Sequence, residues 1–275
     1  MIARSLYENI VREALREDAP FGDPFGEAFH GPASGVFLAG GRGVFCGGPV
    51  AEEVFRQVDP SVSVSFRSEG SRVSPGDKVG EASGPAGSLL RAERVALNFL
   101  QRLSGVATAT SLYAERIAGH GTRLLDTRKT TPLLRVLEKY AVRVGGGCNH
   151  RFGLDDAVLI KDNHAAVAGG VGEAVGRARA AVGHLVKIEV ETTSLAQVRE
   201  ALDAGAEVIL LDNMGQEVME EAVALVGGRA VTEASGGITP ENAAEVAGTG
   251  VDVLSLGWLT HSAPALDVAL DVVVG

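Results

Sequence analysis

Short apolar segments alternate with helical patterns through the second half of the sequence, and this alternation restricts the fold more than any other feature. The apolar segments return about every 20 to 30 residues, and apolar strands that alternate with helices indicate βαβ units and a parallel sheet. The expected strands are 123–127, 157–161, 186–191, 207–212, 230–235 and 251–257. The expected helices between them are 133–140, 171–182, 195–204, 217–226 and 240–248.

Six or seven such units in so short a stretch favour an α/β barrel over an open sheet, although a full barrel has eight. We therefore expect an α/β protein with an incomplete parallel barrel. Residues 91–118 predict a long helix with a possible break at Ser104-Gly105.

The first 90 residues follow another pattern and predict a small α+β domain. Apolar residues recur at helical spacing in 2–16, which predicts one helix, and Gly and Pro separate the short strands that follow. The expected strands there are 36–39, 43–46, 62–67 and 78–82. The predicted domains are 1–104 and 105–275, with the C-terminal tail packing back on the N-terminal domain.

Composition excludes several classes of protein. The net charge of −10 disfavours a nucleic-acid binder, which would normally be basic. Cys46 and Cys148 lie in no CxxC or Cys/His cluster, so we expect a reducing compartment and no zinc site. No signal peptide and no apolar run of membrane-spanning length is present in the sequence. The expected location is the cytoplasm, with no nucleic-acid or membrane partner.

Polar or glycine residues stand at the end of each predicted strand. In barrel enzymes, the loops after the carboxyl ends of the strands form the active site. A packed scaffold alone does not need a charge or a glycine turn at each of these positions, so the pattern predicts an enzyme site. The residues are 126–129, 161–164, Glu189, Glu191, Asp212-Asn213, 235–237 and Gly257.

The charges at this edge indicate the class of substrate. Residues 120–164 contain eight Lys or Arg and five Asp or Glu, although the whole chain is acidic. A basic cavity concentrates small anions, and Arg and Lys suit carboxylates and phosphates. Later strands add Glu189 and Asp212, which suit Mg²⁺ or sugar hydroxyls. Glycine turns after the last two strands occupy the usual phosphate position, so the sequence predicts a phosphorylated, multiply anionic substrate.

Six motifs in order resemble the quinolinate phosphoribosyltransferase (decarboxylating) family, also called nicotinate-nucleotide pyrophosphorylase. The likeness covers essentially the whole chain and is densest between Arg91 and Gly257. The family's usual Thr after Gly22-Asp23 is replaced here by Pro24-Phe25. The motifs are ERVALNF at 93–99, LSGVAT at 103–108, DTRKTTP at 126–132, GGGCNHRFGL at 145–154, IKDNH at 160–164 and LDN at 211–213.

The resemblance implies an activity, a fold and an assembly. The reaction would transfer the phosphoribosyl group of 5-phosphoribosyl-1-pyrophosphate (PRPP) to quinolinate, releasing CO₂ and pyrophosphate and forming nicotinate mononucleotide for NAD synthesis. The fold would be an N-terminal sandwich followed by an incomplete α/β barrel. The chain would form a homodimer or a higher homo-oligomer.

The resemblance also implies roles for individual residues. Lys129, Lys161, Glu189 and Asp212 would be catalytic, and Glu189 and Asp212 would hold Mg²⁺ with PRPP, directly or through water. Glu189 is preferred to Glu191, although alternate strand residues share a face and both could point inward. Quinolinate would contact Arg128, Lys129, His150, Arg151, Lys161 and an Arg94 donated across the subunit interface. Thr127 would also bind substrate. The 5-phosphate would contact Ser235, Gly236, Gly237, Gly257, Trp258, Leu259 and His261.

Three other readings are compatible with parts of the pattern. A family paralogue, such as those associated with molybdenum transport, would keep the phosphoribosyl machinery but use another acceptor. A non-catalytic binding protein could use the same anion pocket. A sugar-phosphate aldolase would need a Schiff-base lysine, for which Lys161 and Lys187 are the strand candidates.

Overall fold

The computed structural model describes residues 2–274, which form two compact units. The first unit comprises the chain up to Ser111, residues Thr130–Gly146 and the chain from Trp258 onward. The second unit comprises Leu112–Lys129 and Gly147–Gly257. The predicted boundary between residues 104 and 105 stays a prediction.

The first unit contains an antiparallel four-stranded sheet in the order β12-β1-β5-β3. The C-terminal strand pairs with β1 along its length, with Val268 opposite Ala39. A separate two-stranded ladder joins β2 and β4. The bounds are β1 (Pro32–Ala39), β2 (Gly43–Val44), β3 (Ser63–Phe66), β4 (Arg72–Val73), β5 (Lys78–Pro85) and β12 (Val268–Val274).

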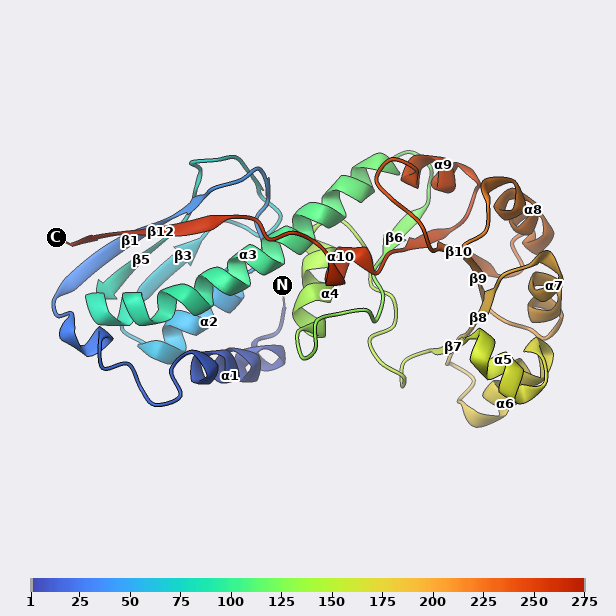
Figure 1. The fold of residues 1–275 in the computed structure, drawn as a ribbon, viewed down its shortest axis with the longest axis horizontal. Coiled ribbons are helices and arrows are strands. Elements are labelled where there is room, and N and C mark those ends of the chain that lie inside the picture. The colour runs from blue at the N-terminus through green and yellow to red at the C-terminus, as the bar shows by residue number, and fades with distance from the viewer. Residues whose placement is uncertain (1, 275) are drawn as a thin grey trace. The chain divides into compact units, whose positions relative to one another are not determined.

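Helices α1, α2 and the first part of α3 lie along one face of this sheet (Figure 1). The prediction of one helix in the first 90 residues was wrong, because α2 is a second one. The dipeptide Gly48-Pro49 at its start is typical of a turn in sequence, but proline is also well suited to the first turn of a helix. The bounds are η1 (Arg4–Leu6), α1 (Glu8–Asp18), η2 (Gly26–Ala28), α2 (Gly48–Val58), α3 (Ala86–Arg116), α4 (Arg135–Val144) and α10 (Trp258–His261).

Helix α3 is continuous, so the expected break at Ser104-Gly105 was wrong. A Cβ atom on Gly105 would lie 2.1 Å from the carbonyl oxygen of Pro264, so this glycine permits close packing. The buried Ser104 hydroxyl accepts a hydrogen bond from the Cys46 N–H and donates one to the Cys46 carbonyl oxygen. Ser104 and Gly105 therefore make contacts with other segments of the first unit, and neither residue interrupts the helix.

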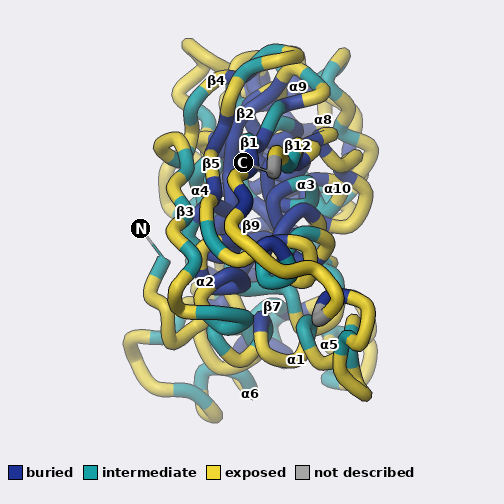
Figure 2. The backbone as a smooth tube through the Cα atoms, turned by 90° about the vertical axis from the view of Figure 1, so that its left-hand side faces the viewer, coloured by how far each residue is buried: buried dark blue, intermediate teal, exposed yellow. Residues whose placement is uncertain are grey.

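The second unit contains a parallel six-stranded sheet in the order β6-β11-β10-β9-β8-β7. Strands β6 and β7 are its two edges, which confirms the expected incomplete barrel. Figure 2 shows the burial of each residue along the backbone, with buried segments in dark blue and exposed segments in yellow. The strand bounds are β6 (Arg123–Leu125), β7 (Val158–Ile160), β8 (Ile188–Thr192), β9 (Val208–Asp212), β10 (Val231–Ser235) and β11 (Val253–Ser255). The helix bounds are α5 (Asp162–Ala168), α6 (Val171–Ala181), α7 (Leu195–Asp203), α8 (Gln216–Val226) and α9 (Ala243–Gly248).

Residues 2–274 contain no helix that could span a membrane. Each helix in this range is too short or too polar to span a bilayer.

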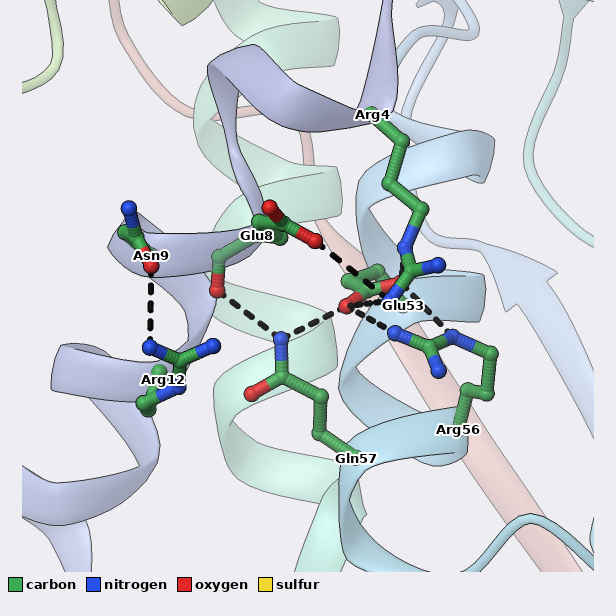
Figure 3. Close-up of polar contacts among 7 residues, drawn as sticks. All are labelled: Arg4, Glu8, Asn9, Arg12, Glu53, Arg56 and Gln57. Carbon is green, nitrogen blue, oxygen red and sulfur yellow. Dashed lines mark hydrogen bonds and ion pairs between the residues drawn. The ribbon is translucent and has the colours of Figure 1, made fainter.

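A buried carboxylate joins the N-terminal segment to α2 (Figure 3). Glu53 is only 3% exposed, and it accepts hydrogen bonds from Arg4 at 2.9 Å, Arg56 at 2.8 Å and Gln57 at 2.6 Å. Burial alone would raise the pKa of Glu53, but these hydrogen bonds outweigh it and lower the pKa. The ionised form of Glu53 therefore stabilises this corner of the first unit.

We predict that Glu53→Ala lowers the free energy of unfolding by about 1–3 kcal/mol at pH 7, because three donors lose their shared acceptor. Urea denaturation would measure the loss, and Glu52→Ala on the exposed side of the same helix is the matched control. A carboxyl group with a lowered pKa stabilises above its unfolded pKa, and that contribution is lost as the pH falls through the folded value. The difference between wild type and Glu53→Ala should therefore shrink in acid, and a difference that stays constant would contradict the prediction.

Candidate active site

A cavity of about 530 Å³ lies at the carboxyl ends of the strands in the second unit. Parallel strands bring their carboxyl ends to one edge, and the register places Ser235 beside Asp212 and Ser255. Most of the predicted site residues of this unit line the cavity. Its polar lining residues are Thr127, Arg128, Lys129, His150, Arg151, Lys161, Glu191, Asp212, Asn213, Glu233, Ser235 and Ser255.

One wall of the cavity is cationic. Burial lowers the pKa of Arg151, and the nearby charge of Arg128 lowers it further. The Arg151 guanidinium also donates to the carbonyl oxygen of Ala157 at 2.8 Å, which restrains the side chain. Crowded, partly dehydrated cations gain stability when an anion joins them. This wall is therefore suited to a ligand with more than one negative charge.

Asp126 holds the loop that carries two of these residues. Its buried carboxylate accepts from the His150 N–H at 2.9 Å and from the Asn149 amide at 2.6 Å. The same loop forms a parallel bridge between Cys148 and Leu125 at the end of β6. The sequence placed Asp126 among the polar residues at the strand ends but gave it no role of its own. Its position directly after an apolar strand was the available signal.

The acidic side of the cavity differs from the expected arrangement. Glu191 lines the cavity, and its Oε2 atom lies 3.2 Å from Lys161 Nζ. Asp212 lines the same cavity and accepts a hydrogen bond from the Asn213 amide at 3.0 Å. Glu189 shares a strand face with Glu191 but lies deeper among buried residues. Thus Glu191, rather than the preferred Glu189, lies in the cavity with Lys161 and Asp212.

A buried acidic cluster lies beneath the cavity, and His150 and Glu233 extend from it into the cavity lining. Glu189 and Glu233 are 5% and 2% exposed, and both face His150. His150 Nε2 lies 3.1 Å from Glu189 Oε2 and 3.6 Å from Glu233 Oε1. Burial, and then the charge of Glu189, raise the pKa of Glu233 to about 7. Glu233 was not among the predicted site residues, although it precedes Ser235 by two positions and so shares its strand face.

The hydrogen bonds of His150 define its tautomer. The Arg151 N–H donates to His150 Nδ1 at 2.7 Å, so Nδ1 carries no hydrogen. The ring hydrogen is then on Nε2 and points toward Glu189. The ligand atoms of His150, Glu189 and Glu233 lie within 4.8 Å of one another, a spacing suited to a metal ion. A hydrogen on Nε2 blocks that ligand position, so the cluster favours a proton over a metal.

The glycine turn after β10 has a backbone conformation that glycine adopts more readily than other residues. Gly236 and Gly237 have φ angles of +90° and +62°, in the region that favours glycine. A Cβ atom on Gly236 would lie 2.3 Å from Asn213 Oδ1, so any other residue there would displace the Asn213 side chain. Gly257 ends the second unit, after β11.

The other predicted residues belong to the first unit. Arg94 lies on the exposed side of α3, where Arg91 and Asn98 are also exposed. Trp258, Leu259 and His261 form part of α10. The side chain of Leu259 is fully buried, so only its backbone could contact a ligand.

Two family models match the chain. The C-terminal domain of quinolinate phosphoribosyl transferase matches residues 106–271, and the N-terminal domain of the same family matches residues 27–104. Together the matches cover both the parallel sheet and the antiparallel sheet.

Curated relatives are similar over nearly the whole chain. A probable nicotinate-nucleotide pyrophosphorylase (carboxylating) from Bacillus subtilis is 45% identical over 268 residues, covering 96% of this chain and 93% of the relative. The quinolinate phosphoribosyltransferase (decarboxylating) 2a of Nicotiana tabacum is 43% identical over 258 residues, covering 86% of this chain and 72% of the relative.

Solved structures have the same fold. The crystal structure of NadC from Streptococcus pyogenes is 42% identical, with a TM-score of 0.95 over 99% of this chain and 98% of that chain. The nicotinate-nucleotide pyrophosphorylase from Francisella tularensis is 37% identical, with a TM-score of 0.95 over 99% and 98% of the two chains.

The acidic cluster predicts a distinctive pH dependence of stability. The pKa of Glu233 is raised from an ordinary 4.5 to about 7, so the folded state holds a proton that the unfolded state releases. Stability from this group is complete below the unfolded pKa and is lost as the pH rises through the folded pKa. Each unit of pKa shift corresponds to about 1.4 kcal/mol.

We therefore expect Glu233→Gln to be increasingly stable relative to wild type as the pH rises from about 4.5 to about 7, and the difference to level off above that range. Urea denaturation of both proteins across this range would measure the effect, and groups common to both cancel. A difference that does not change with pH would contradict the raised pKa of Glu233.

Proposed function

The chain belongs to the quinolinate phosphoribosyl transferase family, and from this we propose that it transfers the phosphoribosyl group of PRPP to quinolinate in NAD biosynthesis. Transfer is coupled to decarboxylation, so the products are nicotinate mononucleotide, pyrophosphate and CO₂. The observation that carries this proposal is the single cavity that joins a cationic wall to the pair of carboxylates of Glu191 and Asp212.

The cationic wall is suited to the acceptor. Quinolinate carries two adjacent carboxylates, and Arg128, Lys129 and Arg151 offer charges and hydrogen-bond donors to both. The lowered pKa of Arg151 reflects burial and the repulsion of Arg128, which a dianion would relieve. These residues would hold the ring so that its nitrogen faces the ribose carbon that is attacked.

The opposite side of the cavity is suited to the donor. Departure of pyrophosphate leaves positive charge on the ribose, which the carboxylates of Glu191 and Asp212 would stabilise without a covalent nucleophile. The 5-phosphate would bind the backbone N–H groups of the turn at 235–237. Gly257, which follows β11 in the same unit, would add a further backbone N–H group.

Decarboxylation needs a cation beside the ring. After transfer the ring nitrogen is positive, and loss of the 2-carboxylate leaves an electron pair on the adjacent ring carbon. Lys129, which is exposed at the cavity, would stabilise this pair until the carbon takes up a proton. Lys161 would contribute charge from its ion pair with Glu191.

The carboxylates also fit a magnesium ion. Glu191 and Asp212 are both partly exposed to one cavity and offer the hard oxygen ligands that Mg²⁺ prefers. Glu189 fits less well, because its Oε2 atom accepts from His150. We therefore assign the metal site to Glu191 and Asp212, with water completing the shell. When bound, Mg²⁺ would neutralise the pyrophosphate of PRPP.

Arg94 would act in an oligomer. Its place on the exposed face of α3 leaves the guanidinium available to a second copy of the chain. A homodimer that shares its active sites in this way remains our proposal, as does a cytoplasmic location.

The proposed function predicts that the protein turns over quinolinate and PRPP. Quinolinate, PRPP and Mg²⁺ should give nicotinate mononucleotide, followed by absorbance and mass, and EDTA should abolish its formation. Nicotinate in place of quinolinate should give no product, because it lacks one of the two carboxylates that the cationic wall would bind. PRPP binding without turnover of quinolinate would instead support a paralogue with another acceptor.

The shared site predicts complementation. Arg94→Ala and Lys129→Ala should each lose turnover, by about two orders of magnitude or more for a charge at the reacting anion. Mixing the two variants and allowing subunits to exchange should restore part of the activity, since one site of a mixed dimer keeps both residues. Each variant mixed with itself is the control. No recovery after exchange, confirmed by mass-tagged subunits, would argue against the shared site.

A further inference from the structure

The cluster beneath the cavity contains more buried negative charge than its visible partners explain. Glu189 and Glu233 are both at least 95% buried, and Glu189 Oε1 and Glu233 Oε1 have no hydrogen-bond partner among the described residues. Two ionised carboxylates so close together and so well buried repel each other strongly. His150 supplies a single N–H between them. One carboxyl group must therefore carry a proton.

We propose that Glu233 is a positioning residue for the reaction: as a neutral acid it hydrogen-bonds Glu189, which in turn holds the His150 ring in the wall of the quinolinate pocket. This inference rests on the proposed function, because it gives His150 its role there. It concerns a residue that contacts another residue of the site, and it assigns Glu233 no contact with the reacting atoms.

The geometry favours this assignment of the proton. Glu189 already accepts the Nε2 hydrogen of His150 at 3.1 Å, so the proton shared by the two carboxyl groups is better placed on Glu233. Glu233 is farther from the ring, at 3.6 Å, and lies within hydrogen-bond reach of Glu189 and Ser255. Its raised pKa agrees with a neutral acid. Hydrogen bonds therefore run from Glu233 through Glu189 to His150 and on to the Arg151 backbone.

The space behind His150 explains why such a support is needed. The first residues of several strands, including Val208, Val231 and Val253, line a second cavity of about 410 Å³. His150, Arg151 and Glu233 border both this cavity and the candidate active site, so they form the partition between them. An imidazole beside an open space is not held by packing alone. The two carboxyl groups hold the ring at the substrate side of the partition.

A matched pair of substitutions tests the proposal. Gln in Glu233→Gln keeps the length, the neutrality and a donor for Glu189, whereas Met in Glu233→Met keeps only the length. We expect Glu233→Gln to stay within about threefold of wild type in turnover and KM, since the hydrogen bond is conserved. Glu233→Met should raise the KM for quinolinate about tenfold or more, because Glu189 loses its donor and His150 its orientation.

Stability and PRPP binding separate positioning from general damage. Replacing a buried acid by an apolar side chain of similar volume should leave the Tm of Glu233→Met at or above that of wild type. PRPP affinity, measured by calorimetry, should change little. Glu217→Met on the exposed side of α8 controls for the replacement itself, and Glu233→Leu provides a second apolar variant if the first does not fold. A stable Met variant with a normal KM for quinolinate, or a Gln variant as defective as the Met variant, would overturn the proposal.

A second readout distinguishes failure of this inference from failure of the proposed function. The ¹⁵N NMR signals of the His150 ring, assigned by their loss in His150→Gln, should show hydrogen on Nε2 in wild type and in Glu233→Gln. That pattern should be lost in Glu233→Met. If wild type does not turn over quinolinate, the proposed function fails, and the ring signals still decide whether Glu233 orients His150. Identical ring signals in all three proteins would refute the inference whatever the activity.

Discussion

The inward face of the six-stranded sheet is charged, and the rest of the candidate site depends on how these charges are accommodated. Branched apolar residues usually fill the interior of an α/β barrel. Here β8 contributes Glu189 and Glu191 to that face, and β10 contributes Glu233. A buried carboxylate is tolerated only with a partner or a proton. Lys161 pairs with Glu191, and His150 pairs with Glu189. These two pairings place one acid in the cavity and the other beneath it.

A second buried charge network in the first unit holds chain segments next to the candidate binding residues. The fully buried Glu138 accepts from Arg102 at 2.6 Å and from the Thr131 N–H at 2.9 Å. Arg102 also donates to the carbonyl oxygens of Thr260 and Ala263. Thr131 follows Lys129 by two positions, and Thr260 belongs to α10. One ion pair therefore restrains the chain that leaves the cationic segment and the helix that follows Gly257.

The sequence predicted the second unit better than the first, because several independent patterns in the second unit indicate the same fold. Apolar strands separated by amphipathic helices fixed each parallel strand to within a few residues, and polar residues at their ends located the cavity. Helix α2 was missed because Gly48-Pro49 has the same local signature in a turn and in a helix start. The expected break in α3 was wrong because Gly105 serves the approach of Pro264, a contact distant in sequence.

The choice between neighbouring acids could not be made from the pattern either. Strand periodicity puts Glu189 and Glu191 on one face, but it does not say which lies nearer the open end of the barrel. That depth determines chemistry: Glu191 is half-buried beside Lys161, whereas Glu189 is buried against His150. The partners of Asp126 and Glu233 could not be predicted for a related reason, since they come from loops and strands far away in the sequence.

The two layers of charge have separate tasks that follow from their depth. The layer at the cavity, with Lys161, Glu191 and Asp212, is accessible enough to exchange its partners for a substrate or a hydrated ion. The layer beneath it is too buried for such exchange without a large cost, so its hydrogen bonds are retained through the reaction. A retained layer can orient the groups above it without reorganising when charge develops on the ligand, which is the condition for electrostatic stabilisation of a transition state. His150 belongs to both layers, because its ring is bound from below and borders the cavity above.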